Sequence, residues 1–194
     1  MSTPKEPDLA KLVISLFMNN KDILESVLPE LEKEFGEIDM ISNWFNFDFT
    51  DYYYAEMGSP LFRSVITFKS LIHQSSLAKI KEHTNLLEKR WEANSKRSLN
   101  IDPGYLLLSR FILATGKDYA HRIYIGKGIY ADLTLMYKQG SFKPLEWTYP
   151  DYASAEMFNF LERVRIQYAE DLKKSRQISR QIADIAADSR YRGR

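Results

Sequence analysis

The 194-residue chain contains no cysteine and only three histidines. The lack of cysteine excludes disulfide bonds, cysteine-ligated zinc, iron–sulfur clusters and cysteine nucleophiles, and it suits a reducing cytoplasm, where we expect the protein to reside. His73, His83 and His121 do not stand in a His-Glu-x-x-His or other known ligand spacing, so the sequence predicts no resident metal. Oxygen-ligated Mg²⁺ stays open, because it needs only one or two carboxylates beside a phosphate.

Long apolar runs and an excess of one charge are also missing. There is no stretch of about 18 apolar residues, and the polar N-terminus lacks the apolar core of a secretory signal, so we expect no membrane span and no membrane partner. The net charge of +1 is too small to favour a polyanionic partner. With 44% hydrophobic and 13% aromatic residues, the composition is that of a globular protein and excludes disorder of the whole chain.

The near-neutral total hides an uneven distribution of charge. Residues 173–194 carry seven basic side chains against Asp184 and Asp188, a charge of +5, whereas the remainder carries 20 basic and 24 acidic residues, a charge of −4. A mildly acidic body with a basic C-terminal arm follows. We therefore divide the chain into a disordered leader (1–8), one α+β domain (9–172) and a basic helical arm or tail (173–194).

The first half of the chain alternates apolar runs with helical patterns. Strands are predicted at Leu9–Met18, Ile38–Phe49 and Leu61–Leu71, and helices between Asn20 and Gly36 and from Ser75 or Ser76 to about Trp91. A further strand at about Arg97–Ile101 would complete a βαββαβ order. This order predicts the ferredoxin-like fold, in which two helices pack on one face of an antiparallel sheet.

The second half is expected to extend that sheet by a hairpin. Asp102-Pro103-Gly104-Tyr105 is predicted as a turn or helix start, and Leu106–Ala114 could be a short helix or a strand. Strong alternation on both sides of Gly126-Lys127-Gly128 predicts a hairpin with a three-residue turn. In that register the predicted pairs are Ile125 with Ile129, Tyr124 with Tyr130, Ile123 with Ala131, and Arg122 with Asp132.

A helical pattern begins at Ala153 and continues to about Asp188. Its first part, from Met157 to Leu172, has a broad apolar stripe, but its second part offers only Ile178, Ile182 and Ile185 beside alanines. So thin a stripe suits a two-helix contact better than a monomer core. Beyond about Lys174 we expect either pairing with a second copy of the chain, giving a homodimer, or a mobile, frayed tail.

Nucleotide-binding signatures are absent. Gly116-Lys117 and Gly126-Lys127-Gly128 lack both the glycine spacing and the following Ser or Thr of a P-loop, and there is no Gly-x-Gly-x-x-Gly. Asn20-Lys21-Asp22 is one residue too short for a guanine-reading motif. A conventional GTPase is therefore not expected, and GTP should bind no better than ATP.

Three polar stretches on predicted turns carry the candidate chemistry. In the first, Asp51 and Glu56 flank consecutive tyrosines; they could act as an acid–base pair or simply remain solvated beside packed rings. In the second, from Asn100 to Asp132, cations beside glycine turns suit phosphate or carboxylate binding, although Arg122 with Asp132 could equally be a cross-strand ion pair. The third, Trp147–Tyr152, is an aromatic turn with a proline that could form the wall of a pocket or simply cover the hairpin. The candidate catalytic residues are Asp51, Glu56, Asp102 and His121, and the candidate ligand-binding residues are Lys117, Arg122, Lys127, Asp132, Tyr149 and Asp151.

Taken together, these motifs resemble a known bacterial family. The segments that carry the resemblance are TDYYYAEMG at 50–58, NIDPGY at 100–105, HRIYIGKGIYAD at 121–132 and WTYPDY at 147–152. They are similar to the family designated Domain of unknown function 4416, over about Leu12–Leu172. The resemblance implies no established activity; some members are labelled GTP-binding, a label for which this sequence has no motif.

Three functions compete on this basis. The first is binding of a small anionic ligand, a nucleotide or phosphorylated metabolite, with Asp51, Glu56, Asp102, His121, Arg122 and Asp151 around one cavity. The second is a non-enzymatic interaction module that uses the C-terminal helix. The third, RNA binding through the sheet and the basic arm, is disfavoured by the neutral total charge and the lack of an RNP-type aromatic motif.

Overall fold

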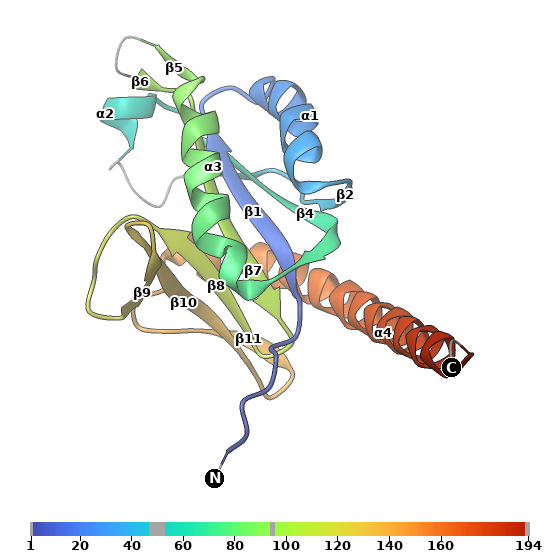
Figure 1. Ribbon diagram of the computed structural model, residues 1–194. Helices are drawn as coiled ribbons and strands as arrows, with labels where there is room; N and C mark the ends of the chain where they lie inside the picture. Colours follow the sequence, from blue (N-terminus) through green and yellow to red (C-terminus); the bar gives the residue numbers. More distant parts are fainter. Residues whose placement is uncertain (1, 47–52, 94–95, 193–194) are drawn as a thin grey trace.

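The computed structural model describes residues 2–46, 53–93 and 96–192 (Figure 1). An antiparallel sheet forms its centre, with helices on both faces. In chain order the main elements are β1 (Ala10–Met18), α1 (Ile23–Phe35), β2 (Ile38–Ile41), β3 (Phe45–Asn46), α2 (Tyr54–Met57), β4 (Phe62–Ile72), α3 (Leu77–Lys89), β5 (Glu92–Ala93), β6 (Lys96–Arg97), β7 (Leu99–Leu107), β8 (Arg110–Thr115), β9 (Arg122–Gly126), β10 (Ile129–Lys138), β11 (Ser141–Pro144) and α4 (Ala155–Arg192).

The sheet runs in the order β11-β10-β8-β7-β1-β4-β2, with β3 paired to β4 and β9 to β10. All of these pairings are antiparallel. Short 3-10 turns precede two helices: Gln74–Ser76 leads into α3, and Pro150–Ala153 leads into α4. The expected mixed α and β architecture, with an antiparallel sheet and a long C-terminal helix, is confirmed.

Strand β1 lies in the middle and shows why the sheet has two different faces. Its alternate residues Leu12, Ile14 and Leu16 are fully buried in an apolar cluster with α1 and α3. The residues between them point to the opposite face, which α4 covers: Val13 joins the cluster of α4, and Lys11 pairs with Asp171 of α4. Figure 1 shows α1 and α3 in front of the sheet and α4 behind it. This period of two is the expected pattern for a strand buried on both faces.

Helix α4 is 38 residues long, or about 57 Å at the usual rise. Its first half buries Met157, Phe160, Leu161, Val164, Tyr168 and Leu172, and the Tyr168 hydroxyl donates to the Leu9 carbonyl at 2.6 Å. The second half continues past the sheet (Figure 1). Within the described residues, the helix has no span that is both long and apolar enough to cross a membrane.

Three predictions about elements need correction. Asp102-Pro103-Gly104-Tyr105 is neither a turn nor a helix start, because β7 runs straight through it. Of the two alternatives for residues 106–114, the strand is correct, but a turn at residues 108–109 divides it between β7 and β8. The predicted strand 38–49 breaks into β2 and β3, with residues 47–49 outside the described part. The predicted connection 140–152 contains β11, which pairs with β10.

The hairpin of β9 and β10 forms where alternation predicted it. Arg122 lies opposite Asp132, Ile123 opposite Ala131 and Tyr124 opposite Tyr130, as predicted. The predicted pair of Ile125 with Ile129 is wrong. A bulge places Gly126 opposite Ile129, so the turn is shorter than the expected three residues. Lys127 and Gly128 form it with positive φ values of 59° and 72°, which suit a two-residue hairpin turn.

Candidate functional site

The site begins where strands β7 and β8 separate. β7 pairs with β1 over Leu99–Leu106, but with β8 only over Gly104–Leu107. Beyond that point β8 pairs only with β10, up to Thr115. Gly104 stands where the strands part, and a Cβ atom there would lie 2.3 Å from the carbonyl oxygen of Ile112. Glycine is therefore needed for close approach of the two backbones rather than for a turn.

Two charged side chains of α3 take the place of the missing strand beside β7. Glu88 accepts a hydrogen bond from the Ile101 amide at 2.9 Å, and Lys81 donates to the Ile101 carbonyl at 2.7 Å. Both side chains are buried and lie 3.5 Å apart. Burial raises the pKa of Glu88. These two residues satisfy backbone groups that would otherwise be buried without partners, so a structural role explains them.

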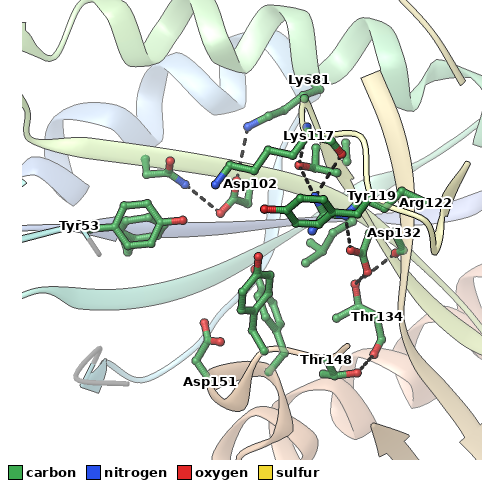
Figure 2. Close-up of a pocket in the computed structure, with 18 of the residues that line it drawn as sticks. Tyr53, Lys81, Asp102, Lys117, Tyr119, Arg122, Asp132, Thr134, Thr148 and Asp151 are labelled. Carbon is green, nitrogen blue, oxygen red and sulfur yellow. Dashed lines mark hydrogen bonds and ion pairs between the residues drawn. The ribbon is translucent and has the colours of Figure 1, made fainter. Parts of the chain in front are cut away.

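The opening between β7 and β8 forms a cavity of about 640 Å³ (Figure 2). Segments far apart in sequence line it: residues 53–56, β7, the end of β8 with its following loop, β10, and residues 147–152. Seven of the ten predicted site residues line this cavity, namely Glu56, Asp102, Lys117, Arg122, Asp132, Tyr149 and Asp151.

The other three predicted residues do not line it. Asp51 lies outside the described residues. His121 sits behind the wall, with its ring stacked on Trp147 at 4.8 Å and its Nε2 3.3 Å from Asp132. Lys127 forms an exposed ion pair with Glu82 at 2.5 Å, because the hairpin turn points it away from the cavity. Lys127 is therefore not among the residues that line this cavity.

Arg122 shapes the wall formed by β8 and β10. Its guanidinium is almost fully buried and donates to Asp132 at 2.8 Å and to the Lys117 carbonyl at 3.1 Å. It also lies over the Tyr119 ring at 4.4 Å. Thr134 donates to Asp132 at 3.2 Å. Arg122 therefore holds the loop 115–119 against the hairpin, because its guanidinium binds both the Lys117 carbonyl of the loop and the Asp132 carboxylate of β10.

Residues 147–152 form the opposite wall, and hydrogen bonds attach them to β10. The Trp147 indole donates to the Leu133 carbonyl at 2.9 Å, and the Thr148 hydroxyl donates to the Thr134 carbonyl at 2.6 Å. Further along, Asp151 pairs with Arg63 of β4, and both side chains are under a tenth exposed. This segment is thus fixed at both ends as a rigid wall.

Arg63 stands at the base of the cavity among aromatic rings. Its guanidinium lies 4.6 Å from the Tyr152 ring centre and 5.5 Å from that of Phe17. Burial raises the pKa of the Tyr152 hydroxyl, so this tyrosine stays protonated at any physiological pH. Sequence analysis missed Arg63, although a cation within the apolar strand 61–71 is the signal that could have singled it out.

The rim of the cavity is a second ion-pair network, centred on Arg97. This side chain donates to both oxygens of Glu56, at 2.5 and 2.9 Å, and to Glu88 at 2.9 Å. The hydrogen bond from Arg97 holds the pKa of Glu56 below its usual value. Tyr53 also lines the cavity, and burial together with the charge of Asp102 raises the pKa of its hydroxyl to about 12. Arg97 and Tyr53 were also missed, because their roles depend on contacts between distant segments.

Opposite charges balance in the cavity. Its lining includes five cations, Arg63, Lys81, Arg97, Lys117 and Arg122, and five carboxylates, Glu56, Glu88, Asp102, Asp132 and Asp151, so its formal charge is zero. Within the described residues, no group of three or more acidic or histidine side chains is arranged to hold a metal ion. The arrangement can bind a polar molecule through charged and hydroxyl groups, and Asp102 can accept or return a proton.

A family model described as "Domain of unknown function (DUF4416)" matches residues 8–168, which include the whole sheet and the cavity. The chain belongs to the DUF4416 family. The resemblance of the four motifs is thereby confirmed. Comparison with curated proteins and with solved structures gives no match.

The motifs of this DUF4416 chain fall on the walls of one cavity. Glu56 lies on the rim, Asp102 on β7, Arg122 and Asp132 on the hairpin, and Asp151 on the wall before α4. The family match ends at Tyr168, so the second half of α4 lies outside it.

Proposed function

We propose that this DUF4416 domain binds a small anionic ligand, a nucleotide or phosphorylated metabolite, in the cavity between β7 and β8. The observation that carries the proposal is the density of charge around a preformed hollow: ten ionisable acidic and basic side chains line it. Burying charge is costly, and a core built only for stability would use apolar residues there. Clustered charges in a cleft are instead typical of binding and catalytic sites.

The balance of charges is compatible with an anion. Each carboxylate of the lining already has a cation within reach: Glu56 has Arg97, Asp132 has Arg122, and Asp151 has Arg63. An incoming anion therefore meets carboxylates whose charge is already compensated. A phosphate could bring Mg²⁺ with it, coordinated mainly by phosphate oxygens and water.

Among the predicted acid–base residues, Asp102 fits that role best. Both oxygens of Glu56 accept hydrogen bonds from Arg97, and the His121 ring is stacked on Trp147. The Asp102 side chain is 28% exposed and lines the cavity. Any proton transfer to a bound ligand would therefore involve Asp102.

The test is a calorimetric and thermal-shift screen of the full chain against ATP, GTP, sugar phosphates and nucleoside monophosphates, with and without Mg²⁺. A ligand of the native state raises the melting temperature in a concentration-dependent way. Lys117→Gln should weaken binding, whereas Lys127→Gln, the same change outside the cavity, should leave it intact. No stabilisation by any member of the screen would refute the proposal, and selective binding of GTP over ATP would refute the expected lack of guanine preference.

We also assign the first part of the domain to the ferredoxin-like class and the protein to the cytoplasm. The strand order β7-β1-β4-β2 supports the fold assignment, since α1 and α3 connect its strands on one face of the sheet. The absence of cysteine supports the compartment.

A second candidate function, a homodimer through α4, is favoured by one observation. Ile178 and Ile182 are 55% and 62% exposed, yet they follow the buried Phe160 and Val164 by eighteen residues, which is five helical turns. The apolar line of α4 thus continues beyond the sheet that covers it. Ile178→Glu with Ile182→Glu should turn a dimer into a monomer in light scattering. Ile166→Glu is the matched control, since Ile166 is 63% exposed on the other side of the helix; a monomeric wild-type chain would refute the dimer.

A further inference from the structure

Aromatic rings line part of the cavity, and we propose that they bind the planar base of a nucleotide, which stacks on Tyr149 and Tyr119. This inference rests on the proposed function and deepens it. Among the small anionic ligands it selects nucleotides, and it excludes sugar phosphates and other ligands that have no planar ring.

Exposed aromatic side chains are unevenly distributed over the described residues. Four of them are exposed, namely Tyr119, Tyr124, Trp147 and Tyr149, and all except Tyr124 line the cavity. Single exposed apolar residues are normal on a protein surface, whereas several gathered in one place mark a binding site. Tyr124 packs instead on Tyr130 of the neighbouring strand, with the ring centres 5.4 Å apart. The aromatic surface that the fold leaves exposed is thus concentrated at the cavity.

Tyr149 is held on a fixed piece of backbone, yet its side chain is exposed. On one side of it the Thr148 hydroxyl donates to the Thr134 carbonyl at 2.6 Å, and on the other the Tyr152 amide donates to the Tyr149 carbonyl at 3.0 Å. Pro150 follows directly and restricts Tyr149 to its extended conformation. The residue is nevertheless 50% exposed. A ring presented from such a backbone loses little conformational freedom when a ligand packs against it.

Tyr119 supplies a second ring, from the loop that follows β8. The Arg122 guanidinium lies over this ring, 4.4 Å from its centre, and thereby fixes its orientation. The residue is still 49% exposed, so much of the ring remains accessible to a ligand. Figure 2 shows the Tyr119 side chain extending into the cavity, with its hydroxyl pointing toward that of Tyr53.

Tyr53 brings a third ring close to Tyr149. Burial, and then the charges of Asp102 and Tyr149, raise the pKa of the Tyr53 hydroxyl. The influence of Tyr149 requires that the two hydroxyls lie near each other. Phe17 packs edge-on against the Tyr53 ring, with the ring centres 4.7 Å apart, and holds it in place. Three segments that are distant in sequence therefore direct tyrosines into one space.

A ligand that fits these rings has flat apolar faces and a polar edge, because hydroxyls and charged groups surround the rings. A nucleobase has this combination, and proteins commonly bind bases by stacking them on aromatic side chains. A sugar phosphate has no planar face. The cavity volume of about 640 Å³ is large enough for a nucleotide. Stacking distinguishes the bases poorly, since every base has a π-face, which agrees with the expected lack of preference for GTP over ATP.

The first experiment needs only the wild-type chain. Calorimetry compares adenosine 5′-monophosphate with ribose 5-phosphate, which is the same molecule without its base, and with guanosine 5′-monophosphate. We expect adenosine 5′-monophosphate to bind about tenfold or more tightly than ribose 5-phosphate, as for the loss of one stacked base. The two nucleotides should bind within a few-fold of each other.

Variants then assign the base to the tyrosines. Tyr149→Leu keeps an apolar side chain but removes the ring, and should weaken binding of adenosine 5′-monophosphate about tenfold while leaving that of ribose 5-phosphate unchanged. Tyr149→Phe keeps the ring and should retain most of the preference. Tyr124→Leu is the matched control, because Tyr124 is an exposed tyrosine that does not line the cavity. Melting curves check that each variant is folded; if Tyr149→Leu does not fold, the comparison on the wild-type chain still decides.

The outcomes separate this inference from the function on which it rests. If ribose 5-phosphate binds as tightly as adenosine 5′-monophosphate, the base is not recognised: the proposed function stands and this inference is wrong. If the nucleotide is preferred but neither Tyr149→Leu nor Tyr119→Leu reduces the preference, the assignment to these rings is wrong. If no phosphate of the wider screen binds at all, both proposals fail.

Discussion

Lys11 and Arg63 are two buried cations on the same face of the sheet, at opposite ends of it. Lys11 is fully buried on β1, and Arg63 lies opposite Phe17, six residues or about 20 Å further along that strand. Lys11 is closed in by Asp39 of β2 and by Asp171 of α4, at 2.8 Å. Arg63 pairs with Asp151 and borders the cavity.

The comparison shows that buried charge alone does not mark a functional site. At the Lys11 end, two carboxylates and a lysine fasten β2 and α4 to the central strand, and none of the three lines the cavity beside β7. At the Arg63 end, the divergence of β7 from β8 leaves space that the protein does not fill. What distinguishes the two ends is the hollow beside the ion pair, and the following experiments test that distinction.

The largest effect is expected for Arg63→Met. It leaves Asp151 buried and without its cation, and should lower the free energy of unfolding by about 3–5 kcal/mol, measured by urea denaturation. The double variant Arg63→Met with Asp151→Leu removes both charges and should recover most of this loss. A double variant no more stable than Arg63→Met would mean that the aromatic contacts of Arg63, not the ion pair, hold this end together.

Gly104→Ala comes next. The added methyl group would collide with the Ile112 carbonyl, and β7 and β8 would have to shift apart, at a cost of about 3 kcal/mol. Gly116→Ala is the matched control on the same cavity, because a Cβ atom there meets no neighbour within 4 Å. Equal stability of the two variants, again from urea denaturation, would contradict the close approach at Gly104.

Lys11→Met should cost less than Arg63→Met, about 2 kcal/mol, because Asp39 and Asp171 retain 15% and 17% exposure and can recruit water. It should leave ligand affinity unchanged, since Lys11 is far from the cavity. A loss of affinity as large as that of Lys117→Gln would show that the two ends are coupled.

The smallest expected effect concerns two tyrosines, one at each end of the sheet, whose titration distinguishes the two ends. Burial raises the pKa of both Tyr53, at the cavity, and Tyr168, near Lys11, to about 12. Because both folded values lie above the unfolded value of 10.0, these groups contribute stability below pH 10 that is lost as the pH rises from 10 toward 12. In absorbance titration at alkaline pH, Tyr53→Phe and Tyr168→Phe should each remove one late step. A bound phosphorylated ligand should change the pH at which Tyr53 titrates and leave that of Tyr168 unchanged. A change in the titration of Tyr168 would contradict the distinction between the two ends of the sheet.

The local pattern of the sequence predicted most of the elements. Apolar runs and helical spacing located β1, α1, β4, α3 and α4, and alternation located the hairpin with three of its four expected pairs. The failure at residues 102–105 has a physical cause. Pro103 and Gly104 usually signal a turn, but here β7 has a single neighbour over part of its length, where proline is tolerated, and glycine allows a close crossing.

The site was predictable only as a set of motifs. Seven of the predicted polar residues do line one cavity, because their segments meet where β7 and β8 separate. The motifs could not show that Arg122 would bind the backbone of the neighbouring loop, nor that Lys127 would pair with Glu82 outside the cavity. They also missed Arg63, Lys81 and Arg97, whose partners come from elements distant in sequence.

The contact of Lys81 and Glu88 with Ile101 also bears on solubility. The half of β7 that does not pair with β8 is an edge inside the sheet. An edge with unpaired backbone groups can pair with a strand of another chain, which leads to aggregation. Here the lysine occupies the Ile101 carbonyl and the glutamate occupies its amide, so an incoming strand would have to displace both and leave two charges stranded. A helix thus shields the edge with one residue of each sign, and the sheet can stay open for a small molecule while remaining closed to another polypeptide.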